Sequence, residues 1–300
     1  MSLTTHLNIF VISARNGGVS LILALASAIS CCAQSTASAG PGQQSAHANA
    51  AVLLENLSWD EAEHVLSPNT VVVITLGAES KEHGRHLQLN NDFLMAEYLK
   101  KRVLAAAPQN TVVAPTINYS YYPAFLEYPG STSLSMDTAR AMITDIIHSL
   151  AHYGPRRFYI LNTGISTLGP LAQATADLAK DGIVLHYTDL TKDDPVEKKL
   201  RQSGGTHADE IETSMMLYIA PESVRMKKAV RDLNPNQPGG LTRDPQGKGT
   251  YSPTGAWGDP TLATREKGEA VTESLVSTIL KDIEELRQAA PSPAAAAPPK

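Results

Sequence analysis

The sequence predicts an α/β protein with three layers, α/β/α, in which helices cover both faces of a mainly parallel sheet. Two observations carry this prediction. Short apolar runs rich in β-branched residues, such as Val71-Val72-Val73-Ile74-Thr75-Leu76, lack polar alternation, which is typical of strands buried on both faces. Stretches with helical spacing of apolar residues separate these runs. Strands and helices that alternate in this order favour right-handed crossovers and a parallel sheet.

The first elements are each marked by local signals. Ser58, followed three residues later by Glu61, forms a capping-box pattern at the start of a helix. The apolar run at 71–76 is the first strand. Asp92 is expected to open an amphipathic helix, and the run at 111–114 is expected to form the second strand.

The later elements follow the same alternation. Ser135 is expected to cap a helix, because apolar residues recur behind it at the i, i+3, i+4, i+7 spacing of one helix face. A loop rich in proline and glycine is expected from 234 to 260. The remaining expected elements are a strand at 158–161, a helix at 168–180, a strand at 183–185, and helices at 207–219 and 264–288.

Composition limits the class of protein. The chain has 300 residues with 25 basic and 30 acidic side chains, a formal net charge of −5, which argues against a general nucleic-acid surface. Residues 51–288 fit one domain of ordinary size and contain no apolar run of 18 residues, so no internal membrane span is expected.

Residues 1–32 have the features of an export signal. A short apolar segment follows Arg15, and small residues with Cys31 and Cys32 come next. Two interpretations are open: cleavage by an ordinary signal peptidase near Ala33 or Ala39, or a lipoprotein signal that leaves a lipid anchor on Cys31. Either predicts an exported protein, periplasmic or secreted.

Low-complexity segments flank the predicted domain. Residues 33–50 are rich in Ala, Ser, Gly and Gln and are typical of a flexible linker, and residues 289–300 form a Pro/Ala-rich tail expected to be disordered. Because both cysteines lie in the predicted signal, the domain itself has no disulfide.

Metal-binding side chains are concentrated just after the strand at 71–76. Glu82, His83, His86 and Asp92 bring two carboxylates and two imidazoles into one short loop. Open α/β sheets place their sites beyond the carboxyl ends of their strands. Imidazole and carboxylate together suit a divalent ion such as zinc or manganese.

This stretch resembles the creatininase (creatinine amidohydrolase) family. The family pattern E-x-H-G-x-H-L-x-L-x-x-D is matched in register by His83, Gly84, His86, Leu87, Leu89 and Asp92. A second family block, H-A-G-x-x-E-T-S, is similar to residues 207–214, and weaker similarities occur at 128–131 and 258–261. The resemblance extends from about Trp59 to Leu286. It implies the family's three-layer fold and an amidohydrolase that uses one or two divalent ions, zinc or manganese.

The resemblance implies ligand roles for the first block. His83 matches a family metal ligand, and Asp92 matches the aspartate that bridges two metals; from the residues alone, Asp92 also fits a helix N-cap. The family's ligating glutamate falls at Lys81, whose ammonium has no lone pair to offer. We favour Glu82 as its replacement, with Glu79 as the competing candidate.

The second block implies the acid–base chemistry. His207 matches the family histidine that acts as general acid and base, and Glu212 is expected to bind metal or to orient His207. The alternative for this pair is polar residues that face solvent at the start of a helix. His86 is expected to be either a hydrogen-bond partner of a ligand or an exposed loop histidine.

The chain departs from the family pattern at two places. Gly164 stands where typical members have a ligating histidine, and Ala124-Phe125 replace a Glu-His pair. Loss of an imidazole from a two-metal site predicts one metal or a weaker site.

These observations predict an exported, metal-dependent amidohydrolase that cleaves a non-peptide C–N bond, a cyclic or linear amide of a small molecule. The rival hypothesis is an exported small-molecule binder that kept the fold and has a degenerate metal site. The resemblance also implies a homo-oligomer.

Overall fold

The structure, a computed structural model, describes residues 51–289. The predicted signal at 1–32, the linker at 33–50 and nearly all of the tail at 289–300 lie outside the described residues, and so does the proposed lipid anchor at Cys31. Within residues 51–289, no helix combines the length and the hydropathy needed to cross a membrane.

A five-stranded sheet forms the centre of the domain, and every neighbouring pair of its strands is parallel. β2 lies in the middle and has all six of its residues buried, which explains its unbroken apolar sequence. The strands, in spatial order, are β1 (Val52–Leu53), β3 (Thr111–Ile117), β2 (Val71–Leu76), β4 (Arg157–Asn162) and β5 (Val184–Tyr187).

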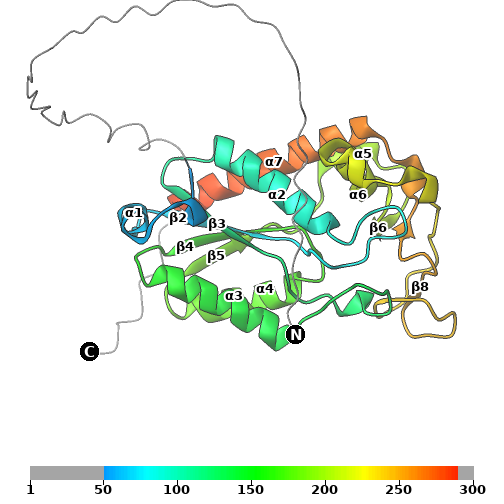
Figure 1. The fold of residues 1–300 in the computed structure, drawn as a ribbon, viewed down its shortest axis with the longest axis horizontal. Coiled ribbons are helices and arrows are strands. Elements are labelled where there is room, and N and C mark those ends of the chain that lie inside the picture. The colour runs from blue at the N-terminus through cyan, green and yellow to red at the C-terminus, as the bar shows by residue number, and fades with distance from the viewer. Residues whose placement is uncertain (1–50, 290–300) are drawn as a thin grey trace, which may run out of the picture. The chain divides into compact units, whose positions relative to one another are not determined.

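Helices cover both faces of this sheet (Figure 1). Val71 and Val73 of β2 point into one core, and Val72 and Ile74 point into the other, as the alternation of side chains along a strand requires. The first core is covered by α2 (Asn91–Ala106), α6 (Glu210–Ile219) and α7 (Arg265–Gln288), and the second by α3 (Met136–Ala151) and α4 (Leu168–Ala179). The predicted three-layer fold is confirmed.

The cap predictions for two helices are confirmed. Ser58 and Glu61 form the capping box at the start of α1 (Trp59–Val65). The Ser135 hydroxyl accepts a hydrogen bond from the backbone N–H of Thr138 at 3.1 Å at the start of α3.

Smaller elements complete the domain. They are the helix α5 (Pro195–Leu200), an antiparallel pair β6 (Gly205–His207) and β9 (Trp257–Gly258), a parallel pair β7 (Leu241–Thr242) and β8 (Thr250–Tyr251), and 3₁₀ turns at Leu54–Asn56, Pro123–Phe125, Pro221–Ser223, Met226–Lys228 and Pro260–Leu262. The segment from 234 to 260, expected to be a loop, therefore contains three short strands.

Two boundary predictions near the site are wrong. α2 begins at Asn91 with Asn90 as its N-cap, so Asp92 lies inside the first turn and does not open the helix. His207 is not helical; it ends β6, and α6 begins at Glu210 because the Asp209 carboxylate caps it by accepting from the N–H groups of the first turn.

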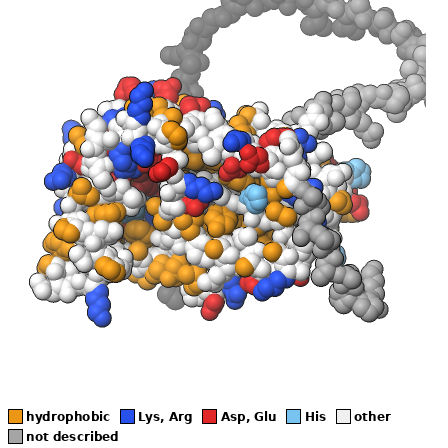
Figure 2. Space-filling model, turned by 180° about the vertical axis from the view of Figure 1, so that it is seen from behind, with side chains coloured by type: hydrophobic (Ala, Val, Ile, Leu, Met, Phe, Trp, Pro, Cys, Tyr) orange, Lys and Arg blue, Asp and Glu red, His pale blue; other side chains and the backbone are white. Residues whose placement is uncertain are grey.

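Charged side chains of both signs are mixed on one face of the domain. On the face seen from behind, basic and acidic side chains lie next to one another (Figure 2). The prediction that the protein does not bind nucleic acid stays a prediction.

Candidate metal centre and active site

The predicted site residues meet at the carboxyl ends of the central strands. His83 and Asp92 follow β2, and Gly164 follows β4. His207 and Glu212 are brought to the same place by β6 and by the first turn of α6. The position agrees with the general location of sites in open α/β sheets.

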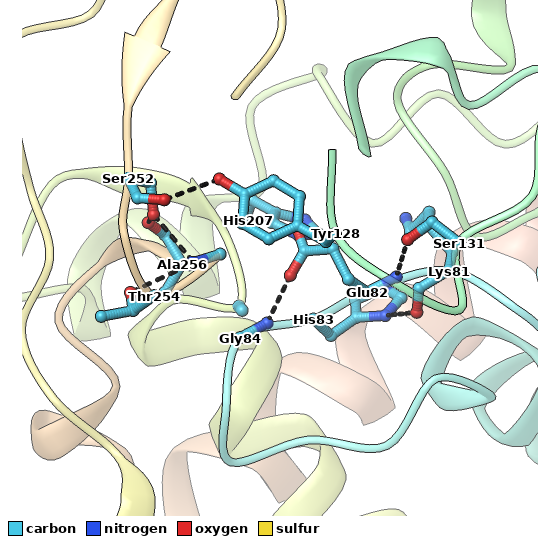
Figure 3. Close-up of polar contacts among 12 residues, drawn as sticks. Lys81, Glu82, His83, Gly84, Tyr128, Ser131, His207, Ser252, Thr254 and Ala256 are labelled. Atoms are coloured by element: carbon cyan, nitrogen blue, oxygen red, sulfur yellow. Dashed lines mark hydrogen bonds and ion pairs between the residues drawn. The ribbon is translucent and has the colours of Figure 1, made fainter. Parts of the chain in front are cut away.

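His83 is fully buried and its ring is held in one orientation. Its Nδ1 lies 3.0 Å from the carbonyl oxygen of Lys81, and since a carbonyl can only accept, Nδ1 carries the proton (Figure 3). In the neutral ring Nε2 then has a lone pair. That nitrogen lies 2.7 Å from Asp92 Oδ1 and 3.4 Å from Glu212 Oε1. Three electron-rich atoms this close together require a cation between them, either a proton or a metal ion.

A group of ligand atoms converges here. One donor atom each from His83, His207 and Glu212 lies within 4.8 Å of the others. Ligands about 2.0–2.2 Å from a tetrahedral ion are about 3.4 Å apart, which the separation of His83 Nε2 from Glu212 Oε1 matches. Imidazole nitrogens with a carboxylate oxygen are donors that zinc and manganese accept. The residues present therefore fit a divalent ion.

Glu212 is held in place by two hydrogen bonds. Its Oε1 accepts from Asn91 Nδ2 at 2.9 Å and its Oε2 from the backbone N–H of Ala208 at 2.7 Å. Ala208 has a φ of 48°, a left-handed conformation that is costly for a residue with a Cβ. The strain at Ala208 is offset by contacts that orient the carboxylate toward His83.

Glu82 lies beside His207 instead of within the ligand group. Its Oε1 accepts a hydrogen bond from His207 Nε2 at 2.9 Å, and its Oε2 accepts from the backbone N–H of Gly84 at 2.8 Å (Figure 3). The backbone at Gly255 packs closely against this carboxylate. A Cβ at this position would lie 2.2 Å from Glu82 Oε2, so a larger residue would clash with it.

The pairing with Glu82 changes the acidity of His207. Burial disfavours the charged imidazolium, but the charge of Glu82 and its hydrogen bond outweigh burial, and the pKa of His207 lies above its ordinary value. The Phe125 ring lies over the imidazole, with ring centroids 4.5 Å apart. His207 is thus a buried histidine whose protonated form is stabilised by Glu82.

Asp92 shares its two oxygens between two partners. Oδ1 faces His83, and Oδ2 lies 2.7 Å from Lys81 Nζ, with both side chains almost fully buried. Burial alone would raise the pKa of Asp92, but the charges of His83 and Lys81 hold it well below its usual range. The Lys81 ammonium also lies over the rings of Phe125 and Tyr122, 4.9 and 5.5 Å from their centroids.

The other candidates lie outside this group. Glu79 is exposed and accepts a hydrogen bond from Asn118 at 2.6 Å, so the structure does not bring it to His83. His86 is buried, so the interpretation as an exposed loop histidine is wrong. Its Nε2 lies 2.8 Å from Thr213 Oγ1, and burial with the nearby imidazoles lowers its pKa to about 4.

Sequence reasoning missed several side chains that shape the site. Asn91, which orients Glu212, lies one residue before the recognised Asp92, and this proximity was the available signal. Ser131, whose hydroxyl accepts from the backbone N–H of Glu82 at 3.0 Å, lies in the weaker similarity at 128–131 (Figure 3).

The site opens into a cavity of about 360 Å³. Its lining includes Lys81, Phe125, Gly164, His207, Glu212 and Trp257. A Cβ at Gly164 would meet nothing closer than Thr167 Oγ1 at 3.4 Å, so the position would accept a Cβ atom without a clash.

Comparison with known protein families matches residues 55–283 to the creatininase family, described as creatinine amidohydrolase. The chain belongs to the creatininase family. A creatinine amidohydrolase of Pseudomonas putida is 30% identical over 264 residues, which cover 78% of this chain and 96% of that protein. The family consists of metal-dependent amidohydrolases, so the chain belongs to an enzyme family that cleaves C–N bonds.

Other relatives extend the range of chemistry and confirm the fold. A mycofactocin precursor peptide peptidase of Mycobacterium tuberculosis (strain CDC 1551 / Oshkosh) is 25% identical over 232 residues, 72% of this chain and 86% of that protein. A manganese creatininase superposes with a TM-score of 0.63 at 25% identity and covers 80% of this chain and 100% of that one. A zinc–zinc form of a creatininase variant, 24% identical, has a TM-score of 0.61 and covers 79% and 98%.

Proposed function

We propose that this protein is a metal-dependent amidohydrolase that cleaves a non-peptide C–N bond, a cyclic or linear amide, of a small molecule. The observation that carries the proposal is the convergence of donor atoms of His83, His207 and Glu212 within 4.8 Å, two of which, His207 and Glu212, line a cavity of about 360 Å³. A cavity of this size suits a small substrate. The similarity to a creatinine amidohydrolase supports the amide bond as the target.

In this proposal His83 and Glu212 hold zinc or manganese, with Oδ1 of Asp92 beside them. A divalent ion bound there supplies Lewis acidity toward a carbonyl oxygen or a water molecule. Asn91 orients the Glu212 carboxylate through its hydrogen bond, and the Lys81 carbonyl fixes the tautomer of His83.

His207 is the proposed proton carrier. Its Nε2–H donates to Glu82, which stabilises the protonated ring and keeps the imidazole in a fixed orientation at the cavity wall. A histidine with these contacts can take a proton from attacking water and deliver it to the leaving amine. As a member of the converging group, His207 alternatively provides a third ligand, and the two roles predict different metal contents.

The first test is the metal content per chain of the purified protein, measured by elemental analysis. We expect His83→Ala and Glu212→Ala to lose the bound metal. His207→Ala is expected to keep it and to lose turnover; loss of the metal in this variant would make His207 a ligand. His148→Ala is the matched control, because His148 is a half-exposed histidine paired with Asp181 far from the site. Absence of zinc and manganese from the wild-type protein would contradict the proposal. It would favour the rival hypothesis of a small-molecule-binding protein with a degenerate metal site.

The substrate test compares classes of amide. The turnover of cyclic and linear amides of small molecules, creatinine among them, is measured with the metal-loaded protein. The turnover of short peptides is measured with the same preparation. The peptidase relatives at 25% identity are the observation that keeps peptide cleavage as the second candidate. Faster turnover of peptides than of any small amide would replace the first candidate by the second.

We further propose that the protein is exported and forms a homo-oligomer. The apolar segment that follows Arg15 supports export. Fractionation of cells that express the full chain, and light scattering of the purified protein, test the two statements. Recovery in the cytosol would contradict export, and the mass of a single chain would contradict the oligomer.

A further inference from the structure

We propose that the Lys81 ammonium takes the place of a second metal ion, so that this site binds a single divalent ion next to a built-in cation. This inference rests on the proposed function, since it assumes that the first ion binds at His83 and Glu212. It adds a residue that sequence reasoning excluded, because an ammonium cannot be a ligand but can replace the charge of the ion.

The first support is the burial and fixed position of the ammonium. Lys81 is 5% exposed, and its Nζ lies 2.7 Å from Asp92 Oδ2. The rings of Phe125 and Tyr122 flank the charge. A buried lysine is tolerated only where an opposite charge compensates it, so Lys81 and Asp92 form one structural unit.

The second support is the way Asp92 divides its oxygens. A carboxylate that bridges two metal ions gives one oxygen to each. Here Oδ1 faces Nε2 of His83, where the first ion is proposed, and Oδ2 faces the ammonium of Lys81. Asp92 therefore still lies between two cation positions, but the cation at one of them is the ammonium of Lys81 instead of a metal ion. A metal ion at that side would meet both a positive charge and a side chain without a lone pair.

The third support is the lack of ligands on the Lys81 side. Gly164 lines the same cavity and provides no donor side chain, although a Cβ there would meet no atom closer than 3.4 Å. Among residues 51–289, one group of three His, Cys, Asp or Glu side chains meets the geometry for holding a metal ion, and it consists of His83, His207 and Glu212. The positive charge of Lys81 and the number of available ligands therefore both indicate one ion.

The arrangement also gives Lys81 a role toward substrate. Lys81 lines the cavity, and its ammonium has three N–H donors, of which the contact with Asp92 uses one. The remaining donors can bind an oxygen of the substrate, a carbonyl or a carboxylate. A fixed point charge at this place would favour substrates that carry such an oxygen next to the cleaved C–N bond.

The test uses the wild-type protein loaded with manganese(II). We expect one ion per chain at saturation and the electron paramagnetic resonance spectrum of an isolated manganese(II) ion. Two ions per chain with an exchange-coupled spectrum would overturn the inference and leave the proposed function intact. No bound ion at all would overturn both. Because this measurement needs no substitution, a variant that fails to fold cannot obscure the answer.

A gain of the second ion gives an independent test. Lys81→Glu combined with Gly164→His exchanges the ammonium for a carboxylate and adds an imidazole at a second position that lines the same cavity. We expect this variant to bind two ions per chain and to give a coupled spectrum. Lys180→Glu, a charge reversal at an exposed lysine, is the control and is expected to bind one. A folded double variant that still binds one ion would overturn the inference.

Discussion

Replacement of Lys81 by Met isolates the contribution of the buried ammonium to stability. Met has a similar length and fills the same space without the charge. The side chains of Lys81 and Asp92 are 6% and 1% exposed, so the substitution leaves a buried carboxylate that water cannot solvate. Removal of one partner of such a pair costs about 3–5 kcal/mol. In a domain of this size each kcal/mol lowers Tm by about 2–4 °C, which predicts a decrease of about 6–20 °C for Lys81→Met.

The assay is urea and thermal unfolding followed by circular dichroism, with a chelator present so that bound metal does not contribute to the free energy. The matched control is Lys180→Met. Lys180 Nζ lies 2.8 Å from Asp177, but the Lys180 side chain is 73% exposed, and such a pair contributes about 0–1 kcal/mol. Equal unfolding free energies for the two variants would refute the reasoning. A further check is Lys81→Met combined with Asp92→Asn. This double variant should cost less than the sum of the single substitutions, because each single substitution leaves one buried charge without its partner and the double variant leaves none.

Three further perturbations act on the groups around His207. Glu82→Gln should lower the pKa of His207, measured by NMR titration of the metal-free protein. The stabilisation from this pair is complete below the unfolded-state pKa of about 6.5 and is lost as pH rises through the higher folded-state pKa, so wild type and variant should converge in stability at alkaline pH. Gly255→Ala should cost about 1–3 kcal/mol in urea unfolding, because φ is 83° and the new Cβ would lie 2.2 Å from Glu82 Oε2; Gly204→Ala, with its nearest contact at 3.8 Å, should cost less. The pKa of His86 is lowered to about 4, so the unfolded chain binds a proton that the folded protein does not. The wild type should therefore lose up to about 3 kcal/mol as pH falls from about 6.5 to 4, and His86→Gln should lose less over the same range.

The elements that the sequence predicted are those whose burial is regular. β2 is buried on both faces and has an unbroken apolar sequence, and α3 buries Ala139, Ile143 and Ile147 on one face at helical spacing. The short pairs β6–β9 and β7–β8 have two or three residues a strand, too few to show a period. Their position depends on contacts between segments far apart in sequence, which no local pattern contains.

The candidate site also has a part that the sequence predicted and a part that it did not. The spacing of His83, Asp92, His207 and Glu212 in two blocks predicted that they belong together, and the structure brings them together. The partner of Glu82 could not be predicted, because it depends on where β6 places His207 relative to the loop after β2. Lone pairs identify metal ligands but not charge partners, so the residue types alone did not predict the ion pair between Lys81 and Asp92.

We expect substrate choice to depend on a part of the chain other than the two motif blocks. Part of the cavity lining comes from the loop region after 234, through Asn236, Gly240 and Trp257. A Cβ at Gly240 would lie 2.6 Å from Ala124 Cα, so this loop packs against the turn that replaces the family's Glu-His pair. Both segments lie outside the two motif blocks, so we expect that the motifs that support C–N bond cleavage do not by themselves determine which amide enters. Transfer of the Pseudomonas putida substrate to this chain therefore depends on the shape of that wall, and the comparison of amide classes is the experiment that decides it.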